Sequence, residues 1–218
     1  MSTIHPTHGW LHSQWVHLTE PHHQEERWSW RLLESLYTEP YRAYHNLDHV
    51  EACLRLQYRV QRASVALPYH IVTLALFFHD VVYVPGDKRN EALSAGLLRA
   101  VGPTLRLSET EVERAALAVL ATQHHETVAD DEVAQVVVDI DLAILGADPA
   151  EYDAYVQKIR QEYAAVSDEA WRVGRGEFLA GMLARTGTVF KTAWGIESFE
   201  QPARANMRRE LAALETKE

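Results

Sequence analysis

The chain has 218 residues, of which 47% are hydrophobic and 24% are charged, a composition typical of a globular protein and not of a disordered one. Its 21 basic and 31 acidic side chains give a formal net charge of −10. A protein that binds a polyanion carries a basic face, so we expect no nucleic-acid polymer as the main partner. The single cysteine, Cys53, excludes an intramolecular disulfide and Cys-rich zinc or iron–sulfur sites.

No apolar run approaches the roughly 20 residues that span a bilayer, and residues 1–9 lack the basic-then-apolar pattern of a signal peptide. We therefore expect a cytoplasmic protein with no membrane partner. Six of the twelve histidines lie in residues 1–23, where apolar residues show no clean periodicity. We expect this segment to be a surface-draped N-terminal arm, with a metal-binding tail as the alternative. Residues 24–218 contain no repeat or linker and are predicted to form one domain.

In chain order, helical spacing of apolar residues and helix-capping signals predict helices over 24–37, 47–66, 69–80, 90–101, 108–124, 132–145, 151–166, 167–184 and 202–214. The helix over 69–80 is apolar on every side, which is typical of a buried central helix. Ser108 and Glu111 fit a capping box at a helix start. Residues 136–140 have strand propensity but no partner strands, so we predict an all-α, single-domain helical bundle.

Polar residues on apolar helix faces are informative, because an isolated buried charge is costly unless it is paired or bound to a metal. His79 and Asp80 end the most hydrophobic helix, with no lysine or arginine nearby on it. Asp141 has apolar neighbours three and four residues away on both sides, whereas Asp139 lies on a more mixed face. We therefore expect Asp141 to be buried and Asp139 not.

Histidines near helix ends add to these carboxylates. His45 and His49 are four residues apart and share a face if the turn is helical, and His124 follows an apolar face while His125 is rotated towards Thr122. A single buried histidine is ordinarily a hydrogen-bonded core residue, and an inert helical bundle is the alternative here. Several histidines together with aspartates favour a metal site for Mn, Fe, Co, Ni or Zn, with Mg also open.

The order of His49, the adjacent pair His79-Asp80 and Asp141 resembles the H…HD…D pattern of the HD superfamily of metal-dependent phosphohydrolases. More closely, over roughly residues 28–210 the chain resembles a group of bacterial proteins described as predicted metal-dependent HD phosphohydrolases. The resemblance implies an HD-type fold with His49, His79, Asp80 and Asp141 as metal ligands, and it leaves the substrate open.

A second, local resemblance covers Tyr44-His45-Asn46 followed by His49, which is similar to the YHNxxH segment of cyclic-nucleotide phosphodiesterases. It implies that His45 is the general acid that protonates the leaving oxygen and that His49 binds metal. Those enzymes carry a further histidine shortly after the HD pair, where this chain has Tyr83 or its neighbours. Cyclic-nucleotide activity is therefore not expected.

The leading hypothesis is hydrolysis of a phosphate ester or anhydride in a small phosphorylated molecule, a nucleotide being expected, by water that the metal activates. Asp80 would hold the metal and orient the water. Asn90 and Glu91 would orient a ligand or a water, with an ordinary role at a helix start as the alternative. The expected phosphate-binding cations are Lys88, Arg89, Arg160, Lys191 and Arg204.

Three alternatives stay open. His124 could bring a second metal, giving a dinuclear HD phosphodiesterase or an iron oxygenase. The chain could also be a ligand-binding HD module without catalytic activity. The sequence alone leaves the substrate, the identity of the metal and the oligomeric state undetermined.

Overall fold

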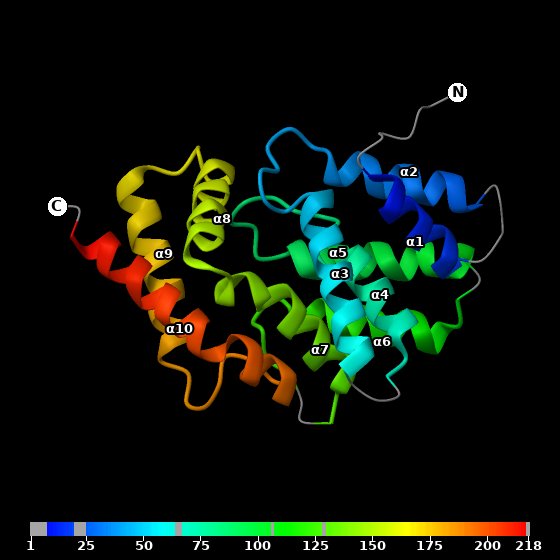
Figure 1. Cartoon of the computed structure of the whole chain (residues 1–218). Helices are drawn as coiled ribbons and strands as arrows, with labels where there is room; N and C mark the ends of the chain where they lie inside the picture. Colours follow the sequence, from blue (N-terminus) through cyan, green and yellow to red (C-terminus); the bar gives the residue numbers. More distant parts are fainter. Residues whose placement is uncertain (1–7, 20–24, 64–66, 106, 128–129, 217–218) are drawn as a thin grey trace.

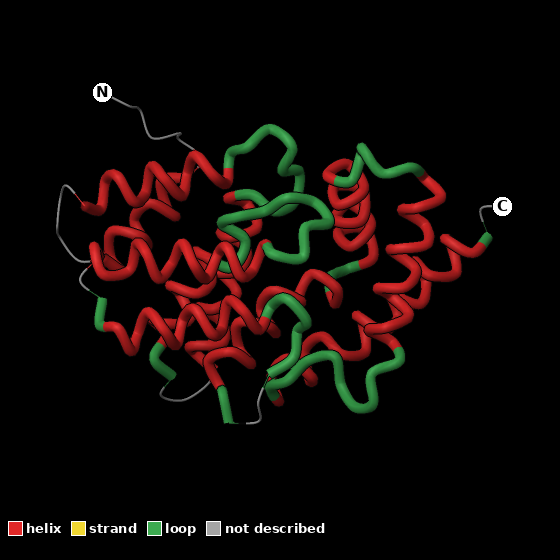
Figure 2. The backbone as a smooth tube through the Cα atoms, turned by 180° about the vertical axis from the view of Figure 1, so that it is seen from behind, coloured by secondary structure: helices red, strands yellow, loops and turns green. Residues whose placement is uncertain are grey.

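The computed structural model describes residues 8–19, 25–63, 67–105, 107–127 and 130–216 of the chain. Within these ranges the regular elements are all helical, which confirms the predicted all-α class (Figure 2). The α-helices are α1 (Gly9–Thr19), α2 (Glu25–Tyr37), α3 (Leu47–Ala63), α4 (Tyr69–Phe78), α5 (Asn90–Val101), α6 (Glu109–Ala121), α7 (Glu132–Asp141), α8 (Pro149–Glu162), α9 (Asp168–Leu183) and α10 (Ala193–Glu215). Two 3₁₀ helices, η2 (Gly102–Leu105) and η3 (Leu142–Gly146), follow α5 and α7.

The helices pack around two hydrophobic cores that meet near the end of α7. The first core is built from α1–α7, and α4 is buried on nearly all sides within it, as the sequence predicts. The second is built from η3 and α8–α10 around Tyr152, Leu179, Phe190 and Met207. Figure 1 shows α8–α10 on one side of the molecule and α1–α6 on the other. A site at this junction can draw side chains from both cores.

The N-terminal segment is not a surface-draped arm where it is described. Residues 9–19 form α1, in which Leu11 and Trp15 are fully buried. The Trp15 indole N–H donates to Ser29 Oγ (3.2 Å), and its ring packs edge-on against Phe77. A narrow apolar stripe spaced by four residues, set among histidines, gives too weak a periodicity to indicate this helix. Residues 1–7 and 20–23 of the predicted arm lie outside the described residues.

The predicted start of the last helix is also wrong. The helix α10 begins at Ala193, nine residues before Pro202, and includes that proline in its interior. The Thr192 side chain caps its start by accepting a hydrogen bond from the Gly195 N–H (2.9 Å). Proline removes one backbone donor and ordinarily ends a helix. Packing of residues on both sides of Pro202 against the second core outweighs that cost.

The other helix ends differ from their predictions by a few residues. The helix predicted over 69–80 ends at Phe78, and the one predicted over 132–145 changes to 3₁₀ after Asp141. The helix predicted over 151–166 runs from Pro149 to Glu162, and residues 64–66 of another lie outside the described residues. The capping box of Ser108 and Glu111 is confirmed at the start of α6.

Within the part of the chain that is described, none of the helices is both long enough and apolar enough to cross a membrane.

Candidate metal centre

Four side chains from three distant segments of the sequence meet at the ends of three helices. His49 lies in the first turn of α3, His79 and Asp80 directly follow α4, and Asp141 ends α7. Their ligand atoms all lie within 4.8 Å of one another. His49 Nε2 is 3.0 Å from His79 Nε2 and 3.4 Å from Asp141 Oδ1, and His79 Nε2 is 3.1 Å from Asp80 Oδ2. The predicted ligand set is brought together, and this group could hold a metal ion.

Contacts around the cluster orient the His79 ring and position the helix turn that carries His49. His79 is fully buried, and its Nδ1 lies 2.8 Å from the Leu76 carbonyl oxygen. Because a carbonyl can only accept, Nδ1 carries a proton, and Nε2 is left to face the cluster. Asn46 caps α3, since its Oδ1 accepts from the N–H groups of Asp48 (2.9 Å) and His49 (3.3 Å). The cap sets the position of the helix turn that carries His49.

The charges of the cluster favour binding of a cation. In the described structure Asp80 and Asp141 form ion pairs with histidines only. Burial raises the pKa of both carboxyls, but the neighbouring histidines lower it by more. His79 acts on Asp80, and His125 and His49 act on Asp141, so the pKa of each carboxyl lies below its usual range. Burial lowers the pKa of His79, but Asp80 and then Asp141 overcome this and raise it to about 9.

Cys53 forms an alternative donor group with His49 and His79. Its Sγ lies 3.8 Å from both ring nitrogens of His49. Burial raises the pKa of this thiol well above its ordinary value, with Asp141 and Asp80 adding to the effect. Metals bind the thiolate, so the carboxylate group is the better ligand set.

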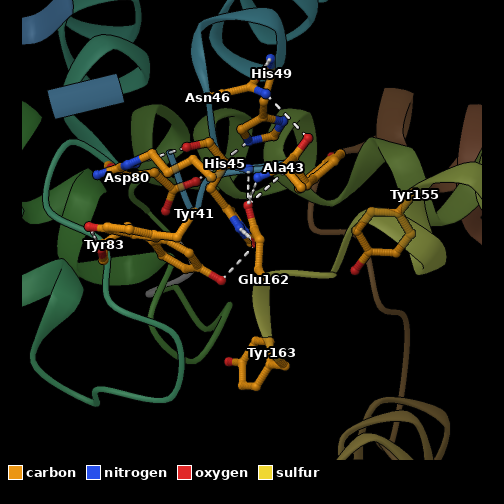
Figure 3. Close-up of polar contacts among 12 residues, drawn as sticks. Tyr41, Ala43, His45, Asn46, His49, Asp80, Tyr83, Tyr155, Glu162 and Tyr163 are labelled. Carbon is orange, nitrogen blue, oxygen red and sulfur yellow. Dashed lines mark hydrogen bonds and ion pairs between the residues drawn. The ribbon is translucent and has the colours of Figure 1, made fainter. Parts of the chain in front are cut away.

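His45 lies beside the cluster and is held by Glu162, the last residue of α8 (Figure 3). Glu162 Oε1 accepts from the backbone N–H groups of Ala43 (2.9 Å), Tyr44 (2.7 Å) and His45 (2.9 Å). Its Oε2 lies 2.6 Å from His45 Nδ1 and accepts from the Tyr83 hydroxyl (2.9 Å). The helix begins only at Leu47, so His45 precedes it and does not share a helical face with His49.

This contact sets the protonation of His45. Because an ionised carboxylate only accepts, His45 Nδ1 carries a proton, and Nε2 is the second nitrogen available for chemistry. Burial lowers the pKa of His45, but Asp80 and Glu162 overcome this and raise it above its ordinary value. For the Glu162 carboxyl the signs are reversed. Burial raises its pKa, but His45 lowers it by more, so the carboxyl stays ionised.

The expectation that Asp141 is buried and Asp139 is not proves wrong. Asp139 is fully buried, whereas the Asp141 side chain keeps 17% of its surface exposed. Asp139 accepts hydrogen bonds from the N–H groups of Lys191 (2.7 Å) and Thr192 (2.8 Å) and from the Thr192 hydroxyl (2.7 Å), at the start of α10. A cluster of donors from a distant helix, which a pattern of nearby apolar residues does not reveal, therefore allows its burial.

The structure places His125, rather than the predicted His124, beside the cluster. His125 Nε2 lies 3.5 Å from Asp141 Oδ2, while His124 is exposed. Arg185 holds the backbone of this segment, because its guanidinium donates to the carbonyls of His124 (2.6 Å) and His125 (3.0 Å). His125 has a φ of 51°, a left-handed conformation that is uncommon for a residue with a side chain.

Two cavities flank the cluster. The larger, of about 630 Å³, is bounded at one end by His45, Asp80, His125 and Asp141, and we call it the aromatic cavity after the rings that line its other end. The smaller, of about 460 Å³, is lined by His49 and Asp141 on its cluster side. Tyr44 and Tyr155 line both cavities, and their ring centroids are 4.7 Å apart.

Of the five cations predicted to bind phosphate, only Lys88 lines either cavity. Arg89 pairs with Asp87 (2.7 Å), and Arg160 donates to the carbonyls of Tyr163 and Val166. Lys191 and Arg204 lie beside Asp139 and Glu200 respectively, outside both cavities.

Of the two residues predicted to orient ligands, Glu91 lines the aromatic cavity, and burial raises its pKa. Asn90, which also lines this cavity, uses its amide to hold the backbone of Val84 through two hydrogen bonds (3.0 and 2.9 Å). Neither side chain forms part of the four-residue donor group.

Sequence reasoning missed Glu162 and Arg42. Arg42 donates to the carbonyls of His45 (2.8 Å), Asp80 (2.7 Å) and Val81 (3.0 Å) and so ties the loop before α3 to the one after α4. Neither residue stands in a motif, and their roles depend on contacts 38 to 119 residues away. No local signal could have identified them.

Comparisons of the chain with protein-family models, curated proteins and solved structures find no match.

Proposed function

We propose that the protein is a metal-dependent phosphohydrolase acting on a phosphate ester or anhydride of a small molecule, a nucleotide being the expected class. The observation that carries this proposal is the convergence of His49, His79, Asp80 and Asp141 on one point beside His45. Two imidazoles and two carboxylates suit Mn, Fe, Co, Ni or Zn better than Mg, which prefers oxygen ligands and water.

A metal held by these four residues would lower the pKa of a bound water and polarise the phosphoryl group. The chain's own contribution is orientation. The Leu76 carbonyl directs His79 Nε2 towards the cluster, and the Asn46 cap fixes the turn that carries His49. Asp80 lines the aromatic cavity, so it is also in reach of a water or a substrate oxygen there.

His45 is suited to be the general acid. It lines the aromatic cavity next to Asp80, and Asp80 and Glu162 raise its pKa above the ordinary value, which favours the protonated form that an acid needs. As the P–O bond of the ester breaks and the oxygen of water bonds to phosphorus, His45 gives a proton to the departing oxygen. Proton transfer of this kind contributes typically ~10² to 10⁴ in rate.

Metal content and turnover of three variants test the proposal. Untagged protein is supplemented with each candidate metal and measured by mass spectrometry, with Asp80→Ala, His45→Ala and His70→Ala beside it. His70 pairs with Glu111 at the surface and serves as the control histidine. We expect about one metal per chain, its loss in Asp80→Ala, and in His45→Ala retained metal with turnover lowered by ~10² to 10⁴.

Absence of metal from the supplemented wild-type protein would contradict the proposal, and so would full turnover of His45→Ala on every active substrate. The contact between His125 and Asp141 supports a dinuclear site as the second candidate. That candidate predicts about two metals per chain and about one in His125→Ala. An equal metal content in wild type and His125→Ala would exclude it.

A further inference from the structure

The aromatic cavity extends well beyond the cluster and has room for a sizeable organic group. Its volume of about 630 Å³ lies within the roughly 300–1,000 Å³ of cavities that bind small molecules. Its far end lies between α8 and α9 and is lined by Tyr155, Ile159, Tyr163, Trp171, Gly174 and Phe178. A phosphorylated substrate whose phosphoryl group meets the cluster would place its organic part here.

The rings at this end are held in place by packing with one another and with a cation. Tyr155 is buried, and the Arg175 guanidinium lies 5.3 Å from its ring centroid and 5.0 Å from that of Phe178. The Trp171 ring packs against Tyr163 at 5.4 Å. Fixed aromatic faces bind flat rings well, because stacking takes little ordering of the side chains.

The charges in the cavity limit the number of phosphate groups. Arg175 is neutralised by Glu210 through two hydrogen bonds (2.9 and 3.1 Å), and so contributes little positive charge to a ligand. Among the described residues that line the cavity, Lys88 is the remaining lysine or arginine. Of the two acids near it in the sequence that also line the cavity, Asp87 is paired with Arg89 (2.7 Å), and Glu91 forms no ion pair in the described structure. A terminal phosphate carries about −1.5 to −2 charges and each further phosphate of a chain adds roughly −1, so Lys88 alone among the lining lysines and arginines would be left to neutralise a second and third.

We propose that the substrate is a phosphate monoester of a molecule with a flat aromatic ring system, the chemistry of a nucleoside monophosphate, with the ring bound at the end of the cavity that Tyr155, Trp171 and Phe178 line. The placement of the phosphoryl group at the cluster rests on the proposed function. The placement of the ring rests on the cavity alone and is tested by measuring binding of nucleosides.

Gly174 offers a direct test, because it lines the cavity within α9 and a Cβ added there meets no atom within 4 Å. Gly174→Leu fills space intended for the ring while favouring the helix, since leucine has the higher helix propensity. Gly181→Leu is the matched control, being in the same helix with equally open space and outside both cavities.

The probes are the nucleoside 5′-monophosphates, the corresponding triphosphates, the nucleosides and glycerol 3-phosphate. Turnover is measured with the metal-loaded protein, and binding of monophosphates and nucleosides by calorimetry. We expect at least one monophosphate to be hydrolysed with kcat/KM about tenfold or more above its triphosphate and above glycerol 3-phosphate. Gly174→Leu should lower the preference for the monophosphate over glycerol 3-phosphate and weaken nucleoside binding about tenfold, and Gly181→Leu should change neither.

Equal efficiency on glycerol 3-phosphate, a preference for the triphosphate, or unchanged ring binding in Gly174→Leu would each overturn the inference while leaving the phosphohydrolase proposal intact. If no ester is hydrolysed, the proposed function fails, and calorimetry then decides the ring site separately. Binding that Gly174→Leu weakens and Gly181→Leu does not would support it, and no binding of any nucleoside or monophosphate would overturn it.

Discussion

The two halves of the molecule each contain a group of charged side chains with little exposure to solvent, and the groups differ in how their charge is balanced. In the half built from α8–α10, Arg175 pairs with Glu210, and the Tyr152 and Tyr155 hydroxyls complete the hydrogen bonds. In the half built from α1–α7, Asp80 and Asp141 face histidines, and no lysine or arginine is ion-paired with them in the described structure. The Arg175–Glu210 group balances its own charge and stabilises the fold. The group with Asp80 and Asp141 pairs two carboxylates with histidines and is suited to bind a metal cation.

The largest expected loss of stability comes from breaking the balanced group. Glu210→Leu leaves Arg175 buried, with 7% of its surface exposed and without its carboxylate. Removing one partner of a buried pair costs about 3–5 kcal/mol, and urea unfolding should show this. The loss should be the same with and without added metal. A loss under ~1 kcal/mol, the range of an exposed pair, would contradict the assignment of this group to the fold.

The complementary change is Asp141→Asn in the other half. It keeps the shape of the side chain and removes one of the two negative charges that oppose His49 and His79. A metal at 100 times its dissociation constant stabilises the wild type by about 2.7 kcal/mol, which melting with and without metal should show. In Asp141→Asn this metal-dependent increase should largely vanish. An undiminished increase in the variant would mean that the metal binds elsewhere.

A comparison of Asp139 with Asp141 sharpens the distinction within a single helix. Asp139→Asn replaces one acceptor oxygen with an amide that faces the donors of Lys191 and Thr192. A buried donor left without its partner costs about 1–3 kcal/mol, so Asp139→Asn should be destabilised by that amount in urea. Its metal content should equal that of the wild type. Loss of metal would show that Asp139 positions the cluster.

This pair of aspartates also shows what the sequence could predict. The all-α class follows from helix periodicity, which is local, whereas the ligand set of His49, His79, Asp80 and Asp141 is predicted from the resemblance of their order to a known motif. The burial of Asp139 depends on donors 52 and 53 residues later in the chain, and the contact of Glu162 with His45 spans 117 residues. Such contacts arise from how the two halves pack, and no pattern of neighbouring residues encodes them.

The smallest expected effect concerns Glu162, which reaches from the second half to the site in the first. Glu162→Gln removes one of the carboxylates that raise the pKa of His45, the others being Asp80 and Asp141. If protonated His45 is the acid, activity falls as pH rises through its pKa. The basic limb of kcat/KM against pH should therefore move to lower pH, by about one unit or 1.4 kcal/mol.

Tyr83→Phe is the matched control for that change, because it removes only the hydroxyl that donates to the same Glu162 oxygen. The carboxylate then keeps its charge and becomes more basic, so it stabilises the protonated His45 at least as well. The basic limb should stay in place or move slightly to higher pH, opposite to Glu162→Gln. A shift to lower pH in both variants would mean that packing around His45, and not the charge of Glu162, controls its protonation.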